Sequence, residues 1–105
     1  MPDTDQILQQ IKRSVLATDP YATLILYGSY ARGDHNADSD IDILVLLDKD
    51  KITFEDRKRI GYPLYHIQVE RDILISPFLC PRKKWEAERS VTPFYKNVAK
   101  DGIVL

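Results

Sequence analysis

Two short apolar runs separated by a polar loop constrain this chain more than any other feature. Residues 23–27 read TLILY and residues 40–47 read DIDILVLL. Both runs are too short for buried helices, and both have the composition and length of strands. The loop between them begins with Gly-Ser and ends at a pair of aspartates. We therefore expect two buried strands, with polar functional groups at the strand ends that the loop connects.

The remaining elements alternate between helical and extended patterns. Apolar side chains at helical spacing predict amphipathic helices over residues 4–17 and from Thr53 onward, although Gly61 and Pro63 weaken the second. A third strand is expected over residues 73–80, where Pro77 favours an edge or a bulge. Two more helices are expected over residues 81–89 and 92–101. The chain is predicted to have an α/β (α+β) fold, with helices around a small sheet.

Composition limits the classes of function. A chain of 105 residues is expected to form one domain spanning residues 1–105. Its net charge of −1 gives no cationic field for long nucleic acids. No apolar run approaches the length of a membrane span, and the N-terminus has no signal-peptide pattern, so a cytoplasmic location is expected. A single cysteine excludes an internal disulfide and a cysteine-based zinc site.

The first half of the polar loop has the residues of a phosphate-binding turn. Gly28 follows a buried strand directly, and glycine allows the backbone to approach a ligand closely. Ser29 can begin a short helix whose free N–H groups face an anion, and its hydroxyl adds a donor. Arg32 could bring a cation to the same place. Gly-Ser alone is also common in simple strand-to-turn connections.

The second half of the loop supplies two carboxylates. Asp40 and Asp42 are two residues apart on an expected strand, so both project to one face. Carboxylates held close together repel unless a cation lies between them, and Mg²⁺ suits such a pair because it also binds substrate phosphates. An Asp-X-Asp at a strand start is often only a solvated edge. Its occurrence next to the Gly-Ser loop favours transfer of a nucleotidyl or phosphoryl group.

The spacing also carries a family resemblance. Gly28-Ser29, ten intervening residues and Asp40-Ile41-Asp42 resemble the minimal nucleotidyltransferase domain of the DNA polymerase beta-like superfamily, and residues 94–103 are similar to small stand-alone members. The resemblance implies a mixed sheet flanked by helices, with Mg²⁺ and ATP as cofactors. It also implies that Gly28 and Ser29 hold the nucleoside triphosphate and that Asp40 and Asp42 bind the metal.

Members of that superfamily usually have a third carboxylate on the next strand. Asp72, just before the apolar run at 73–75, is our candidate for this catalytic and metal-binding position. Glu70, two residues before Asp72, is one strand period away, and Ser76 is the nearest polar residue within the expected strand. Asp72 could equally be a turn residue between helix and strand. Without a third carboxylate, nucleotide binding could persist with slow or absent chemistry.

Three functions fit these expectations. The resemblance favours transfer of AMP to a protein hydroxyl, with a HEPN-domain toxin as the partner that the chain neutralises as an antitoxin. A second hypothesis is a binding antitoxin that masks its partner without catalysis. A third is transfer to a small hydroxylated molecule, although 105 residues leave little chain for an acceptor pocket. The sequence leaves the nucleotide preference and any self-association open.

Overall fold

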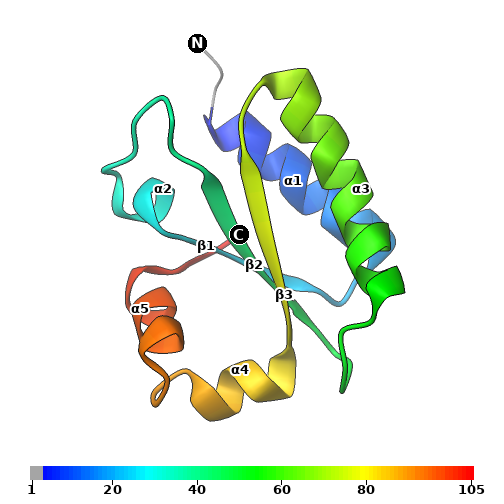
Figure 1. Cartoon of the computed structure of the whole chain (residues 1–105), viewed down its shortest axis with the longest axis vertical. Helices are drawn as coiled ribbons and strands as arrows, with labels where there is room; N and C mark the ends of the chain where they lie inside the picture. Colours follow the sequence, from blue (N-terminus) through cyan, green and yellow to red (C-terminus); the bar gives the residue numbers. More distant parts are fainter. Residues whose placement is uncertain (1–3) are drawn as a thin grey trace.

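The computed structural model describes residues 4–105, which form helices packed around one sheet (Figure 1). The elements in chain order are α1 (Thr4–Thr18), β1 (Thr23–Tyr27), α2 (Ser29–Arg32), β2 (Ile41–Leu47), α3 (Phe54–Arg71), β3 (Ile75–Pro81), α4 (Arg82–Glu88), α5 (Pro93–Asp101) and β4 (Ile103–Val104). None of the helices in this part of the chain is both long and apolar enough to cross a membrane.

The sheet is mixed, with strand order β3-β2-β1-β4. The two apolar runs pair antiparallel as β1 and β2, with Tyr27 opposite Asp42 and Ile25 opposite Leu44. β2 then pairs parallel with β3, which places Ser76 beside Asp42. The predicted α+β fold is therefore confirmed. The two-residue strand β4, which pairs with β1, was not among the expected strands.

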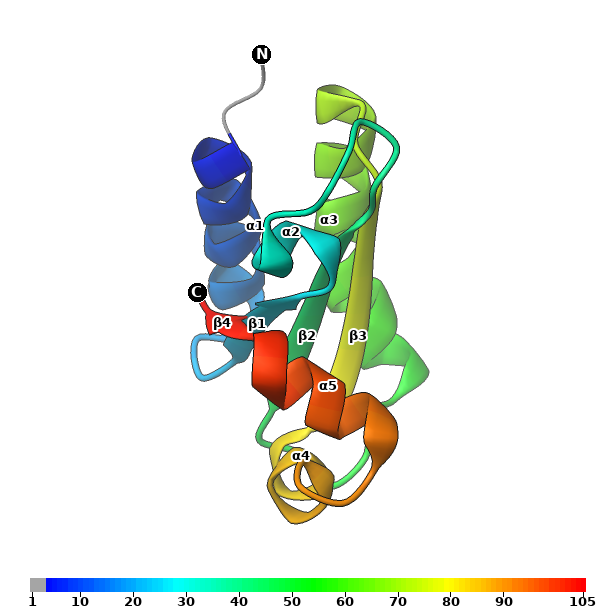
Figure 2. The same cartoon turned by 90° about the vertical axis from the view of Figure 1, so that its left-hand side faces the viewer.

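Each face of the sheet is covered by a different set of helices. Side chains of β2 with odd numbers, such as Ile41 and Ile43, turn toward α1 and α3 and are completely buried. Side chains with even numbers, such as Leu44 and Leu46, turn toward α4 and α5 and pack with Trp85 and the neighbouring helix residues. Figure 2 shows α5 on this second side of the sheet, whereas Tyr30 and Ala31 of α2 pack against the core on the side of α1 and α3. Asp42 has an even number and belongs to the second face.

β3 lies at the edge of the sheet, as Pro77 predicts. Ile41 N–H donates to Leu74 O at 2.8 Å, so in this parallel ladder the odd-numbered residues of β3 turn their own backbone groups outward. The outward N–H of Ile75 donates to Oε1 of Gln68 at 3.0 Å, and Pro77 has no N–H. This edge therefore offers few donors to another strand.

α3 begins where the sequence predicts a helix, after Thr53, and its first turn forms a capping box. Thr53 Oγ1 accepts from the N–H of Asp56, and an oxygen of Asp56 accepts from the N–H of Thr53. The Asp56 side chain also accepts from Lys49 and Arg59, although the residue is only 1% exposed. The helix continues through Pro63 and ends at Arg71, so this proline does not divide it.

Candidate nucleotidyl-transfer site

The predicted phosphate-binding residues form a tight turn at the end of β1, which is called the phosphate turn below. Gly28 has a φ of 74°, which places it in the region that favours glycine, and α2 begins directly after it. The N–H groups of Ala31 and Arg32 both donate to Gly28 O at 3.1 Å. The N–H groups of Ser29 and Tyr30 belong to the first turn and have no acceptor within the helix. The turn thus presents the N–H groups of Ser29 and Tyr30 near the carboxylate of Asp42.

Gly28 lies so close to Asp42 that a side chain added there would force the Asp42 carboxylate to move. A methyl group on Gly28 would lie 2.4 Å from Oδ2 of Asp42, far inside van der Waals contact. Asp42 therefore leans toward β1 and the phosphate turn. The glycine serves two requirements at once, because it supplies the positive φ and leaves room for the carboxylate.

Asp40 and Asp42 lie close enough to influence each other electrostatically. Burial, followed by the negative charge of Asp40, raises the pKa of Asp42, and the positive charge of Arg32 opposes this shift. Asp40 leans the other way, because its Oδ2 accepts a 3.2 Å hydrogen bond from Ser76 Oγ on β3. One carboxylate thus faces the phosphate turn on β1, and the other faces β3.

Arg32 lies near this pair but is held by other acidic side chains. Its Nε is 3.1 Å from Oδ2 of Asp34, and its Nη1 is 3.4 Å from Oδ2 of Asp101 at the end of α5. The side chain remains 45% exposed. Its assignment as a nucleotide-binding residue stays a prediction, and its structural effect is to tie α2 to α5.

The third carboxylate is less well placed. Asp72 is exposed and forms the C-cap of α3 in the left-handed conformation, with a φ of 53°, and its N–H donates to Gln68 O. Ser76 occupies the strand position beside Asp42. The turn role of Asp72 is thus accounted for, while its catalytic and metal-binding roles stay predictions.

The two central carboxylates have the chemistry to hold Mg²⁺. They lie on one face and repel each other, and Oδ2 of Asp42 lies close against the adjoining Gly28 turn. Among residues 4–105, no three His, Cys, Asp or Glu side chains gather to hold a metal ion. A magnesium ion bound by two carboxylates would complete its coordination with water and substrate oxygens, as this ion commonly does.

Three aromatic residues near the carboxylates were not predicted from the sequence to belong to the site. Tyr27 pairs across the strands with Asp42, and burial followed by the charge of Asp42 raises the pKa of the tyrosine hydroxyl. Phe94, near the start of α5, contacts both Tyr27 and Phe78 of β3. Tyr27 could have been found because it directly precedes Gly28. Nothing local marks Phe78 or Phe94, since only the tertiary fold brings them together.

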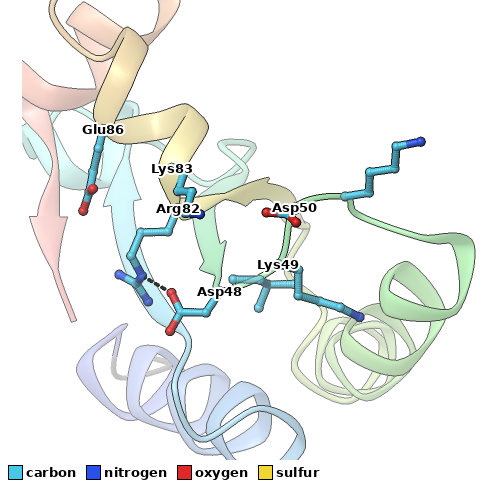
Figure 3. Close-up of a pocket in the computed structure, with 8 residues that line it drawn as sticks. Asp48, Lys49, Asp50, Arg82, Lys83 and Glu86 are labelled. Atoms are coloured by element: carbon cyan, nitrogen blue, oxygen red, sulfur yellow. Dashed lines mark hydrogen bonds and ion pairs between the residues drawn. The ribbon is translucent and has the colours of Figure 1, made fainter.

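A cavity of about 680 Å³ lies far from these carboxylates, at the opposite end of β2 (Figure 3). Three of its charged side chains, Asp48, Lys49 and Arg82, are paired with other groups. Arg82 binds Asp48 and also donates to Thr23 Oγ1 and Tyr21 O, each at 2.8 Å. Lys49 pairs with the buried Asp56. These cations hold the fold together, so the phosphate turn remains the better candidate for a nucleotide.

Comparison with known proteins agrees with the site geometry. The family model described as "Nucleotidyltransferase domain" matches residues 8–105. A Methanocaldococcus jannaschii protein named "Putative protein adenylyltransferase MJ0141" is 36% identical over 76 residues, which cover 70% of this chain and 76% of that protein. Another protein of that organism, "Putative protein adenylyltransferase MJ0604", is 63% identical over 27 residues, which cover 26% of this chain and 27% of that protein.

Proposed function

Because the chain belongs to the nucleotidyltransferase domain family, we propose that it transfers AMP from ATP to a hydroxyl group of another protein. The contact between Gly28 and Asp42 carries this proposal, since it joins a phosphate-binding turn to a carboxylate pair. The names of the two relatives support adenylyl transfer to a protein as the specific reaction.

Each residue of the site has a distinct proposed role. Ser29 and the backbone of the Gly28 turn hold the triphosphate. Asp40 and Asp42 hold Mg²⁺, which when bound neutralises charge on the phosphate oxygens and on the leaving group. Asp42 leans toward the Gly28 turn and Asp40 leans toward β3. The pair would therefore lie between the ATP at the Gly28 turn and the acceptor hydroxyl on the β3 side.

The reaction is a displacement at the α-phosphorus of ATP. The acceptor oxygen forms a bond to that phosphorus, and the bond to the oxygen that bridges the α- and β-phosphates breaks, which releases pyrophosphate. The acceptor proton must leave as the new bond forms. Asp40 is the carboxylate on the acceptor side, and we assign it the uptake of this proton.

We further propose that the acceptor is a HEPN-domain toxin in the cytoplasm, which makes this chain its antitoxin. The resemblance to stand-alone minimal nucleotidyltransferases supports this partner. A small-molecule acceptor would need an enclosing pocket, and the cavity of about 680 Å³ lies at the opposite end of β2 from the carboxylates.

One observation favours a second function, a binding antitoxin without catalysis. Ser76 stands beside Asp42 where a third carboxylate would be expected, and a serine cannot replace a carboxylate as a ligand or a base. In that case the site would hold nucleotide as a structural ligand, and the chain would silence its partner by covering it.

Intact-mass spectrometry of the HEPN-domain protein co-expressed with this chain separates the two functions. The wild-type chain is compared with the Asp40→Asn/Asp42→Asn double variant, which keeps side-chain volume and removes both charges. For the enzyme we expect the mass to increase by whole AMP units only with the wild-type chain. Loss of neutralisation should accompany loss of the modification.

No mass increase with either chain, together with full neutralisation by the double variant, would contradict the transferase and leave the binding antitoxin. The same samples report whether the two proteins co-purify, which shows that the variant still folds and binds.

A further inference from the structure

A partly exposed aromatic cluster adjoins the carboxylate pair. Its members are the half-buried Tyr27 and two phenylalanines, Phe78 and Phe94, which are each 42% exposed. The ring centroid of Phe94 lies 5.6 Å from that of Phe78 and 5.9 Å from that of Tyr27. The cluster is thus a fixed surface that joins β1, β3 and α5. Large exposed apolar surfaces next to functional groups commonly mark contact with a partner.

The strand register fixes this cluster against the site. Asp42 lies between Tyr27 on β1 and Ser76 on β3, and Phe78 follows Ser76 by two residues on the same face. Phe94 comes from α5, which covers the neighbouring part of that face (Figure 2). Phe78, and Phe94 through its contact with Phe78, therefore lie on the β3 side of the carboxylate pair on this face.

The direction of the reaction decides which reactant approaches from that side. In the proposed function the Gly28 turn at the end of β1 holds the triphosphate, so the leaving pyrophosphate departs on that side. In phosphoryl and nucleotidyl transfer the attacking and leaving oxygens lie roughly in line on opposite sides of the phosphorus. The acceptor hydroxyl therefore enters from the β3 side, where Asp40 leans toward Ser76.

We infer that Phe78 and Phe94 form the docking surface for the acceptor protein, which places an apolar or aromatic side chain on them beside its reacting hydroxyl. The inference rests on the proposed function and names the chemistry that its partner must present. Exposed Tyr65 on α3 offers a matched control, because α3 packs on the other face of the sheet.

The test measures acceptor and nucleotide separately in Phe78→Ala, Phe94→Ala and Tyr65→Ala chains. The acceptor is the HEPN-domain protein of the mass-spectrometric experiment, purified unmodified, and AMP transfer is followed against its concentration. Magnesium-dependent ATP binding is measured by calorimetry without acceptor. We expect KM for the acceptor to rise about tenfold or more in both phenylalanine variants, since central aromatic residues dominate interfaces. The nucleotide affinity and the Tyr65→Ala kinetics should stay within about twofold of wild type.

The outcomes separate the inference from the function on which it rests. An unchanged acceptor KM in both phenylalanine variants, with active wild type, would overturn the docking surface alone. A fall in ATP affinity with an unchanged acceptor KM would also overturn it, and would assign the rings to the nucleobase. No transfer by the wild type would reject the proposed function and this inference with it. Phe78 is on an exposed strand position, so Phe78→Ala remains a valid test if Phe94→Ala perturbs α5.

Discussion

Gly28 and Gly33 make an informative pair of residues, because both flank α2 with a positive φ, of 74° and 81°. They differ in what a side chain would meet. A methyl group on Gly28 would lie 2.4 Å from Oδ2 of Asp42, whereas one on Gly33 would meet no atom of the described chain within 4 Å. The same substitution therefore separates backbone strain from damage to the site.

We expect Gly33→Ala to lower the free energy of unfolding by about 1 kcal/mol and to retain magnesium-dependent ATP binding. Gly28→Ala should lower it by more, roughly 2 to 4 kcal/mol, and abolish that binding, because Asp42 must move. Urea denaturation and calorimetry measure the two quantities. Equal losses of stability and of ATP affinity in the two variants would show that the contact between Gly28 and Asp42 does not contribute to nucleotide binding.

The raised pKa of Asp42 predicts how stability depends on pH. A group whose pKa is higher in the folded state favours folding when protonated, and that contribution is lost as pH rises through the folded pKa. Asparagine imitates the protonated form. Without metal, Asp42→Asn should therefore be more stable than wild type at pH 7, and the difference should shrink as pH falls toward about 4.

Thermal unfolding in EDTA across this pH range measures the effect. Asp50→Asn, in the exposed turn after β2, serves as the control and should track the wild type throughout. A lower stability of Asp42→Asn at pH 7 would mean that attraction to Arg32 outweighs burial and the repulsion from Asp40.

At the scale of elements, α3 depends on one buried carboxylate. Burial opposes ionisation of Asp56, but hydrogen bonds from Lys49, Thr53 and Arg59 outweigh it and hold the pKa of Asp56 below its usual range. Asp56→Ala removes the capping box and leaves these donors without their acceptor. We expect a loss on the order of 3 kcal/mol in urea denaturation at pH 7.

The depressed pKa also fixes the pH dependence of this loss. The contribution of Asp56 is present above the unfolded pKa and disappears as pH falls through the folded one. The difference between wild type and Asp56→Ala should therefore be constant from about pH 5 to 8 and decline only in strong acid. Glu55→Ala, at an exposed position of the same first turn, is the control. A difference that vanishes already near pH 4 would contradict the depressed pKa.

Elements with a strong local signal were predictable, and those that depend on tertiary contacts were not. β1, β2 and the capped start of α3 follow from apolar runs and side-chain capping, which act over a few residues. β4 has two residues and exists because it pairs with Ile25 and Leu26 of β1. The continuation of α3 through Pro63 also depends on packing, because Ile60, Leu64 and Ile67 are buried against the sheet.

At the scale of the whole molecule, part of the candidate site was likewise predictable from local sequence, and the rest depends on tertiary contacts. Asp40 and Asp42 could be placed on one face because the alternation of a strand is local. The contact between Gly28 and Asp42 could not be seen, since it requires antiparallel pairing across a loop of twelve residues, 29–40. Phe94 is still further from β1 in sequence, and it reaches Tyr27 only because α5 packs on the second face.

Nucleotide binding should stabilise the molecule as a whole, because the proposed site joins β1, α2 and β2, and Arg32 links α2 to α5. A ligand at one hundred times its Kd adds about 2.7 kcal/mol to the free energy of unfolding. For a domain of this size that corresponds to a rise in Tm of roughly 10 °C. We expect this rise with ATP and Mg²⁺ together and a much smaller one with ATP and EDTA.

The Asp40→Asn/Asp42→Asn variant should lose the magnesium-dependent rise, while Lys83→Glu at the distant cavity should keep it. The two variants together locate the nucleotide, since they alter charge at opposite ends of β2. A rise that persists in the aspartate variant and disappears in Lys83→Glu would place the nucleotide in the distant cavity, and the phosphate turn at Gly28 would then need another ligand.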